Sequence, residues 1–564
     1  MDQLTASRTT RRVLVVLAVL ALLLNGGQWA AAGPATAAES PAVHLPQLSC
    51  AEVAGVDLSG VPGFPTSITA TEVTTAATGG YEVCDVRGTI APQIQFELQL
   101  PTTTYRQRYL QTGCGGLCGT VQIQAQQSEG CLPLTDGSFV TASNDQGHVG
   151  GDGLFGTDAQ LRADFAYRAD HGLAVVAKTL IEQVYGSQPR YSYFDGCSQG
   201  GHEGLTEAQR YPDDFDGIVA GAPASITTEL NSFYQPWLAT INDDDSGAPV
   251  LTADTLPALH AAAMAECDDE DGLIDGQIDD PRACHPDPAA LQCPAGQDSA
   301  ACLTPAQVDV VRAIYSGPVD QQGRRLYLGG EAPGSELAWT PWIIPAAPGT
   351  PSVAETIGGP WLEYLAYEEN PPPSFTVADA TFDRRTFREV RRLAGLYDAT
   401  DPDLSAFRDS GGRLLLYHGW ADQAISPYGT PAYYQAVQDE MGGPAAVREF
   451  ARLYMLPGML HCRGGAAPNT FDALTPVLDW VENGVAPEGI VATDPASGRT
   501  RPVFPYPQVA RYDGTGSVED AADFVAADPA VRYDDHVEWL GDLPTGPTLW
   551  YDDGRLTRHR PADQ

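Results

Sequence analysis

The sequence places a serine between two glycines, in Gly196-Cys197-Ser198-Gln199-Gly200, which is the G-x-S-x-G pattern of a nucleophile elbow. A serine hydroxyl is a poor nucleophile near neutral pH, so it needs a base within hydrogen-bond reach. His461 is the candidate base, although it comes more than 260 residues later. Both residues have a cysteine neighbour, Cys197 and Cys462. If Ser198 and His461 meet, these cysteines lie close together, and we expect a disulfide between them.

An acid that orients the histidine is expected between them, because α/β-hydrolases use the chain order serine, acid, histidine. Asp422 fits, since it follows a predicted strand at 413–419, and His461 follows another at 450–455. Asp422 would orient the His461 ring and stabilise its charged form as it takes the Ser198 proton. Taken singly, Asp422 could be a turn residue and His461 a hydrogen-bonded loop histidine. Their order and placement favour a Ser198–Asp422–His461 triad.

Four other histidines are weaker candidates for the base. His202 lies on the helix that follows the elbow and would point away, and His171 precedes the serine within a helical pattern. His148 and His418 lie near glycines at strand ends, where we expect local hydrogen bonding.

A tetrahedral intermediate needs two backbone donors. Gln199 N–H should be the first, because it directly follows the nucleophile. The second is expected from the glycine-rich segment 113–119, where Gly115 or Gly116 would let the backbone approach the oxyanion. The alternative for this segment is a tight turn closed by a disulfide.

An acidic motif lies at 267–279. Its carboxylates and two flexible glycines suit a hard cation such as Ca²⁺, and the expected ligands are the side chains of Asp268, Asp271 and Asp275 with the carbonyls of Leu273 and Gln277. It is not an EF-hand, because the spacing differs and no glutamate closes the loop. The alternative is a solvated acidic turn. A cation here would be structural.

The N-terminus is typical of a secretory signal peptide over 1–38, with basic residues, an apolar run at 13–24 and a small-residue cleavage site. Twelve apolar residues are too few to span a bilayer. A twin-arginine signal is the alternative export route, but it carries folded proteins and suits a disulfide-rich chain poorly. The protein is therefore expected to be secreted and extracellular, with no membrane partner.

Eleven cysteines in an exported chain indicate disulfides. Spacing suggests two local pairs besides the one at the elbow, Cys267–Cys284 and Cys293–Cys302. The remaining five are an odd number, so at least one is free or bound to another molecule; they are Cys50, Cys84, Cys114, Cys118 and Cys131. The formal net charge of −41 makes nucleic acid an improbable partner, because phosphate backbones are repelled.

Residues 81–100 alternate like strands of a half-buried sheet, most clearly at 94–100, and residues 158–185 carry a helical pattern. Strand, helix and strand patterns then follow up to residue 224, break over 225–395, which is rich in Pro, Gly, Asp and Cys, and return from 396 to 530. Strand, helix, strand in this order indicates a parallel sheet covered on both faces. We therefore expect an α/β-hydrolase fold, with 39–224 and 396–530 as the catalytic domain, 225–395 as an inserted lid, and 531–564 as an irregular acidic extension.

Taken together, the motifs resemble those of the tannase/feruloyl esterase family of α/β-hydrolases. They are Gly196 to Gly201, Tyr211 to Pro223, His418 to Asp422 and His461-Cys462, and the resemblance runs from about Cys50 to Ala526. It implies the triad, the Cys197–Cys462 disulfide, a lid with the calcium loop, and a Cys50–Cys84 pair. Phe504 and Ala526 stand where many members have a C-terminal disulfide, which implies a looser C-terminus.

The resemblance implies a serine carboxylic-ester hydrolase acting on aromatic acyl groups such as feruloyl or galloyl, in small esters or plant polymers. Trp339 and Trp342 could stack on the substrate ring or belong to the core. One alternative is action on other aromatic esters, such as terephthalate monoesters. Another is an inactive protein that binds phenolic or glycan ligands, against which the intact triad argues.

Overall fold

The computed structural model describes residues 41–537 except 77 and 298, and residues 548–560 except 553, 554 and 559. The chain divides into two compact units, Met1–Pro41 and Ala42–Gln564, and the fold below is that of the second. The predicted signal peptide at 1–38 lies outside the described residues. Among the described helices, none is both long and apolar enough to cross a membrane.

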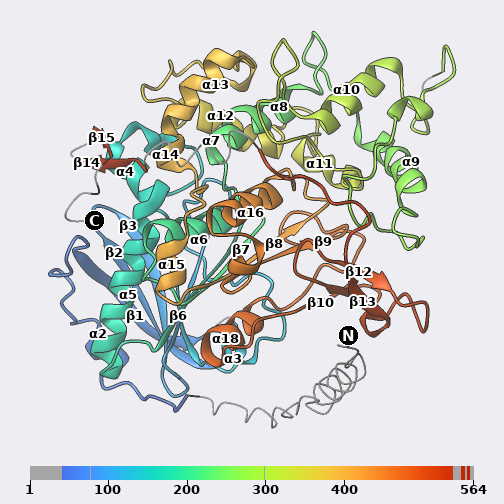
Figure 1. The fold of residues 1–564 in the computed structure, drawn as a ribbon. Coiled ribbons are helices and arrows are strands. Elements are labelled where there is room, and N and C mark those ends of the chain that lie inside the picture. Colours follow the sequence, from blue (N-terminus) through green and yellow to red (C-terminus); the bar gives the residue numbers. More distant parts are fainter. Residues whose placement is uncertain are drawn as a thin grey trace, which may run out of the picture. The chain divides into compact units, whose positions relative to one another are not determined.

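A nine-stranded sheet forms the centre of the described chain (Figure 1). The strand order is β1-β2-β3-β5-β4-β6-β7-β8-β9. Neighbours from β1 to β5 pair antiparallel, whereas β5, β4 and β6 to β9 are all parallel. The strands span Thr66–Thr75, Glu82–Ile90, Ile94–Pro101, Arg108–Thr112, Phe139–Asn144, Tyr191–Cys197, Gly217–Gly221, Arg413–Gly419 and Ala451–Leu456.

The parallel sheet expected from the strand–helix–strand order is formed by β4 to β9, and the strands expected over 81–100 join it as the antiparallel hairpin of β2 and β3. The β2–β3 hairpin can pair antiparallel because only three residues connect its strands. Its second strand, β3, alternates buried and more exposed positions, as a half-exposed antiparallel sheet does. The parallel strands β4 to β9 are instead almost continuously buried, because helices cover both faces.

The helix predicted from the pattern at 158–185 is interrupted. It begins with α4 (Ala159–Ala163), continues through a π-helical turn at Asp164–Arg168, and ends with α5 (Ala169–Tyr185). The Asp158 side chain caps the start by accepting N–H groups of Gln160 and Leu161. The apolar stripe of α5 is buried as its spacing predicts, because a 3.6-residue period puts these positions on one face.

Helices α5 and α6 (Gln199–Arg210) belong to the larger hydrophobic core, whereas α18 (Leu474–Asn483) packs with β7 and β8 in a second core. The remaining helices of the catalytic part are α2 (Cys50–Val53), α3 (Leu132–Thr135), α15 (Ser405–Asp409), α16 (Gly429–Glu440) and α17 (Pro444–Val447).

Between β7 and β8 the described chain forms helices and loops and adds no strand to the central sheet. In Figure 1 this stretch, drawn green to yellow, gathers at the top of the view. We call residues 225–395 the inserted segment. Its helices are α7 (Thr227–Glu229), α8 (Gln235–Thr240), α9 (Leu256–Cys267), α10 (Pro305–Ser316), α11 (Trp339–Trp342), α12 (Val353–Tyr364), α13 (Arg384–Val390) and α14 (Ala394–Tyr397, which extends just past it).

The C-terminal part carries small two-stranded sheets. They are β10 (Ile490–Thr493) with β11 (Thr500–Val503), β12 (Val509–Tyr512) with β13 (Phe524–Ala527), and β14 (Trp550–Asp552) with β15 (Arg555–Thr557). The last pair lies in the extension expected to be irregular. Trp550 is buried there beside Tyr167 and Tyr211. This packing explains why the segment forms a strand pair that its composition did not predict.

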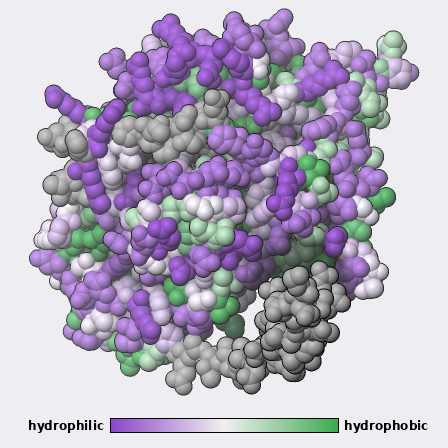
Figure 2. Space-filling view, in the orientation of Figure 1, coloured by the Kyte–Doolittle hydropathy of each residue, from purple (hydrophilic) through white to green (hydrophobic). Residues whose placement is uncertain are grey.

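The face seen in Figure 2 is mostly hydrophilic, with apolar residues in small scattered groups. This agrees with the excess of 73 Asp and Glu over 32 Lys and Arg.

Buried carboxyl groups make stability depend on pH. Burial raises the pKa of Asp145 to about 6, although the N–H groups of Gly147 and Gln95 lower it in part. Between about pH 4 and 6 the folded protein keeps a proton that the unfolded chain has lost, so stability falls as pH rises through this window. We expect Asp145→Asn to remove up to about 3 kcal/mol of this pH dependence. Urea unfolding at pH 4.5 and 7.5 gives the change in unfolding free energy between the two pH values. The same change in variant and wild type would contradict the prediction.

Candidate active site

The turn between β6 and α6 holds Ser198 in a strained conformation. Its φ of 67° and ψ of −121° are those of a residue forced out of the usual regions. Close backbone contacts impose this turn: a Cβ on Gly196 would lie 2.5 Å from Gly200 O, and one on Gly201 would lie 2.3 Å from Gly221 O. The two glycines are therefore required by sterics. The result is a nucleophile elbow at the carboxyl end of a parallel strand.

Asp422 and His461 lie in the loops after β8 and β9, and they contact each other. His461 Nδ1 lies 2.8 Å from Asp422 Oδ2. Burial by itself would raise the pKa of Asp422, but the charge of His461 and hydrogen bonds from His418 and His461 outweigh it and hold this pKa well below its usual range. The other oxygen, Oδ1, accepts the N–H groups of Ala424 and Ile425 at 2.8 and 2.9 Å. Asp422 is thus kept ionised and correctly oriented.

His418 makes a contact with the candidate site that the sequence pattern did not predict. Local hydrogen bonding was expected, and its Nδ1 does lie 2.7 Å from Thr430 Oγ1. Its Nε2, however, lies 3.0 Å from Asp422 Oδ2, so His418 supports the candidate acid. The available signal was the short spacing of four residues between His418, at the end of β8, and Asp422, in the loop after it.

Ser198 and His461 line one cavity of about 450 Å³. The inserted segment contributes Trp342, Val353 and Ile357 to its wall, and the Trp342 ring lies 6.0 Å from the His461 ring. The other lining residues come from the glycine-rich segment, a following polar strand-like stretch and the elbow disulfide: Gly113, Cys114, Gly115, Gly116, Thr120, Gln122, Gln124, Gln126, Cys197, Cys462 and Arg463.

Five disulfides are formed in the described residues. Cys197 and Cys462 are bonded with a Cα–Cα distance of 6.0 Å, which joins the elbow to the loop that carries His461. The pairs at Cys267–Cys284, Cys293–Cys302 and Cys50–Cys84 are formed as well. Of the cysteines left open by spacing, Cys114 pairs with Cys118, and Cys131 is a free, buried thiol.

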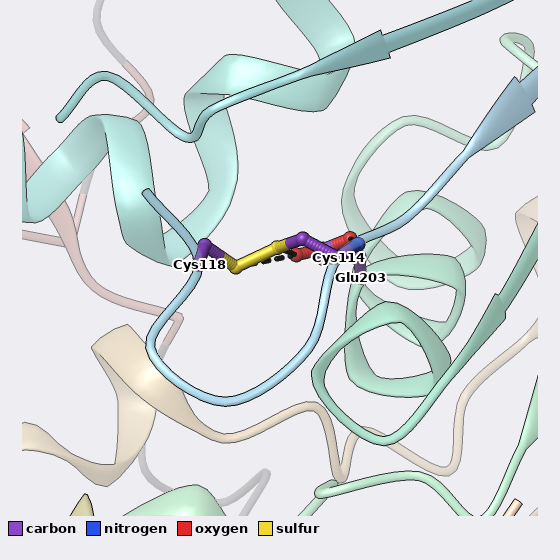
Figure 3. Close-up of side chains that lie close together, drawn as sticks. All are labelled: Cys114, Cys118 and Glu203. Carbon is purple, nitrogen blue, oxygen red and sulfur yellow. Dashed lines mark hydrogen bonds between the residues drawn. A yellow bond between two sulfur atoms is a disulfide. The ribbon is translucent and has the colours of Figure 1, made fainter. Parts of the chain in front are cut away.

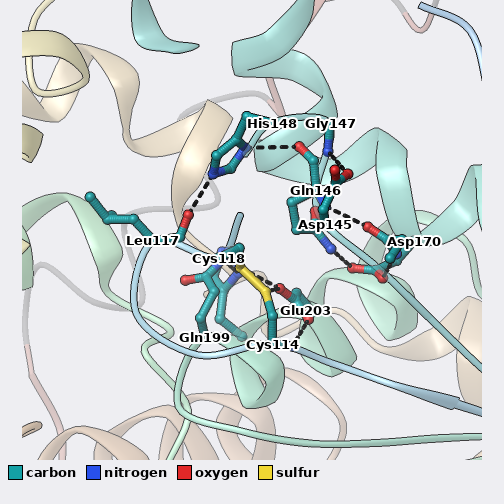
Figure 4. Close-up of a disulfide and its surroundings, with 12 residues drawn as sticks. Cys114, Leu117, Cys118, Asp145, Gln146, Gly147, His148, Asp170, Gln199 and Glu203 are labelled. Carbon is teal, nitrogen blue, oxygen red and sulfur yellow. Dashed lines mark hydrogen bonds between the residues drawn. A yellow bond between two sulfur atoms is a disulfide. The ribbon is translucent and has the colours of Figure 1, made fainter. Parts of the chain in front are cut away.

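The loop of residues 113–119, which we call the glycine loop, lies beside the start of α6. Gly115 and Gly116 border the cavity, and an added Cβ on either would meet open space. Gln199 begins α6, where the first N–H groups of a helix have no partner inside it. Figure 4 shows the glycine loop, its disulfide and Gln199 together. The glycine loop and the start of α6 thus lie together at the cavity that Ser198 lines.

The acidic loop follows α9 and is closed by Cys267–Cys284. Burial raises the pKa of Asp271 and Asp275; Arg499 and Arg501 lower that of Asp275, and neighbouring carboxylates raise it again. Asp268 accepts the N–H groups of Asp275 and Gly276, and Arg499 Nη2 lies 3.2 Å from Gln277 Oε1. Mutually repelling oxygen donors fit a hard cation. In the described chain, however, these aspartates are not among the groups whose ligand atoms lie within 4.8 Å of one another.

The other sequence candidates lie outside the cavity. Trp339 is fully buried and donates its indole N–H to Ser335, so it belongs to the core. His202 is buried with Nε2 2.6 Å from Tyr397 O, which agrees with its expected direction away from the site. His148 Nε2 lies 2.7 Å from Leu117 O, and His171 Nδ1 lies 2.5 Å from Asp214 Oδ2.

Comparison with known sequences gives relatives that act on esters. The pattern of the family described as "Tannase and feruloyl esterase" matches residues 75–527. The chain is 34% identical over 530 residues to mono(2-hydroxyethyl) terephthalate hydrolase of Piscinibacter sakaiensis, covering 82% of this chain and 87% of the relative. It is 35% identical over 462 residues to probable feruloyl esterase B-1 of Aspergillus oryzae, covering 76% and 80%.

Comparison with solved structures gives relatives with the same kinds of names. Feruloyl esterase B from Aspergillus oryzae superposes with a TM-score of 0.73 at 31% identity, covering 82% of this chain and 97% of that one. Tannin acyl hydrolase from Aspergillus niger gives a TM-score of 0.68 at 22% identity, covering 89% and 97%, which shows a shared fold. The chain belongs to the tannase and feruloyl esterase family and is a carboxylic ester hydrolase.

Proposed function

We propose that this protein is a secreted serine esterase that cleaves esters of aromatic acids, such as feruloyl or galloyl esters. The observation that carries the proposal is the 2.8 Å contact between His461 Nδ1 and Asp422 Oδ2, beside a cavity that both Ser198 and His461 line. A base held by a carboxylate beside a half-buried elbow serine that borders a cavity is suited to acyl transfer.

In this mechanism Ser198 Oγ attacks the ester carbonyl while His461 Nε2 takes its proton. Asp422 holds His461 Nδ1–H and stabilises the imidazolium. The oxyanion accepts the N–H groups of Gln199 and of Gly115 or Gly116, which would stabilise the developing charge more than that of the bound ester. His461 then donates its proton to the leaving alcohol, and water hydrolyses the acyl-enzyme by the reverse sequence.

The inserted segment is proposed to act as the lid that forms the acyl pocket. Trp342 supports this role, because its ring lies near His461 on the cavity wall and aromatic rings pack favourably against each other. Gln122, Gln124 and Gln126 line the same cavity and offer amide groups to phenolic hydroxyls. A terephthalate monoester is the second candidate substrate, favoured by the 34% identity to a hydrolase of that class.

Activity profiling separates these substrates. Initial rates with methyl ferulate, methyl gallate and mono(2-hydroxyethyl) terephthalate are compared for wild type and Ser198→Ala. The proposal expects the highest kcat/KM on a phenolic ester and no turnover by the variant. Folded wild-type protein that hydrolyses none of the three esters would refute it.

Secretion is supported by the signal-peptide pattern at 1–38 and by the five disulfides, which form and persist in oxidising compartments. Mass spectrometry of the N-terminus of exported protein would locate the cleavage.

We further propose that the acidic loop holds a structural Ca²⁺, with Asp268, Asp271, Asp275 and the carbonyls of Leu273 and Gln277 as ligands. Its support is the oxygen-only donor set within a disulfide-closed loop; Asp275 also pairs with Arg499 and Arg501, which neutralise part of its charge. The ion would supply charge neutralisation there and no step of ester hydrolysis.

Chelation should therefore lower the melting temperature. A ligand that binds only the folded protein stabilises it by about 2.7 kcal/mol at a hundredfold excess over its Kd. We expect EGTA to lower Tm, Ca²⁺ to restore it, and Asp271→Asn to abolish the response, as measured by scanning fluorimetry. Ser198→Ala is the control that should respond like wild type, and a Tm independent of Ca²⁺ in wild type would refute the site.

A further inference from the structure

The glycine loop is attached to helix α6 by one buried side chain, Glu203. Glu203 comes five residues after Ser198 and is 3% exposed. Its Oε2 accepts the Cys114 N–H at 3.1 Å, and its Oε1 lies 2.8 Å from Cys114 Sγ and 3.4 Å from Cys118 Sγ (Figure 3). A single carboxyl group therefore contacts both the backbone and the disulfide of this loop.

The contact with the disulfide fits a protonated carboxyl group, which can donate a hydrogen bond to sulfur. A disulfide sulfur carries no hydrogen, so only a Glu203 O–H can be the donor. Burial, followed by the charge of Asp170, raises the pKa of Glu203 well above its ordinary value, and the Cys114 N–H lowers it only in part. The neutral side chain can donate to a sulfur with one oxygen while it accepts the Cys114 N–H with the other.

The same helix holds the loop at a second point. The Gly200 N–H donates to the Cys114 carbonyl at 2.7 Å, so both polar groups of the Cys114 backbone are bound to α6. The packing is close, because a Cβ on Gly113 would lie 2.5 Å from Glu203 Oε2. At the other end of the loop, His148 Nε2 is within hydrogen-bond distance of the Leu117 carbonyl oxygen, as Figure 4 shows.

This attachment determines the spacing of the two oxyanion donors. One proposed donor, Gln199, is on α6, and the other, Gly115 or Gly116, is on the glycine loop. An oxyanion hole works only when both donors lie 2.7–3.1 Å from the developing charge. We propose that Glu203 is a positioning residue of the oxyanion hole, which keeps the glycine loop at the correct distance from the nucleophile helix. This inference rests on the serine-esterase mechanism proposed above.

Two substitutions test the inference through a split between kcat and KM. Glu203→Leu removes both contacts, and we expect kcat to fall about 10- to 100-fold while KM stays within about 3-fold, because the donors act mainly in the transition state. Glu203→Gln keeps an acceptor for the Cys114 N–H and an N–H for the sulfur, so its kcat should stay within about 3-fold of wild type. A Glu203→Leu variant with wild-type kcat, or with its loss in KM alone, would overturn the inference.

Glu207→Leu is the matched control. Glu207 lies one turn later on α6 and is 1% exposed, but its carboxyl group faces Asp214 and Lys178. Its substitution should cost stability without lowering kcat. If Glu207→Leu lowered kcat as much as Glu203→Leu, the effect would be one of general helix damage and the inference would fail.

Hydrogen exchange supplies a measurement that needs no substrate. Backbone amides of residues 113–119 should exchange faster in Glu203→Leu than in wild type, and in Glu207→Leu they should not. Should wild type hydrolyse no ester, the proposed function would fall, while exchange would still decide whether Glu203 holds the loop. Unchanged exchange at 113–119 in Glu203→Leu would refute the positioning role even in an active enzyme.

Discussion

Ser198→Ala is expected to lower kcat on an aromatic ester by at least about 10⁴-fold, with Tm unchanged. The substitution removes the atom that forms the acyl-enzyme, whereas the elbow backbone and the neighbouring disulfide remain. Steady-state kinetics and fluorophosphonate labelling measure the effect. Wild type should be labelled at one site and the variant should not.

The candidate acid provides the companion variant. Asp422→Asn should lower kcat about 10⁴-fold, because the amide no longer selects the His461 tautomer that accepts the serine proton. His418→Gln should lower it less, since His418 acts only through Asp422. Labelling of Ser198→Ala equal to that of wild type, or full activity of Asp422→Asn, would disprove the triad.

Removal of the Cys197–Cys462 disulfide should have the largest effect on stability. The bond closes a loop with a sequence separation of 265, for which chain entropy gives a stabilisation of at most about 5.6 kcal/mol. The double variant Cys197→Ala with Cys462→Ala should therefore unfold at a lower temperature. Its kcat should also fall, because the bond joins the nucleophile elbow to the loop of the base. Thermal unfolding and kcat are the two measurements.

A local disulfide of the inserted segment is the matched control. Cys293–Cys302 closes a separation of only 9, for which the same entropy argument gives about half as much stabilisation. Cys293→Ala with Cys302→Ala should lose less stability and keep its kcat. The role of the elbow disulfide would be refuted by a Cys197/Cys462 double variant as stable and active as wild type.

The residues of the site could be named from the sequence because their chemistry is local. A serine between glycines, an aspartate and a histidine after predicted strands, and a cysteine beside each end of the triad are all visible in short stretches. Period-two and period-3.6 patterns likewise predicted β3, α5 and β8. The pattern did not predict β1, β4 or β5; every residue of β4 and β5 is buried, so neither strand shows alternation.

Other features depend on contacts between distant residues and appear only in the tertiary structure. The antiparallel half of the sheet depends on which strands pair, which no single strand encodes. Trp339 and Trp342 lie three residues apart in the sequence, yet Trp339 is buried in the core and Trp342 borders the cavity.

The sequence alone thus predicted Ser198, Asp422 and His461 as a catalytic triad, because residue type, order and spacing suffice to name these candidates. Only the tertiary structure shows which neighbouring residues contact and orient these side chains. The support of Asp422 by His418, the pairing of Cys114 with Cys118 and the contact of Glu203 with both sulfurs arise from packing in three dimensions. A buried carboxyl group can only be assigned a role once its neighbours are known, since burial and hydrogen bonding determine whether it is charged.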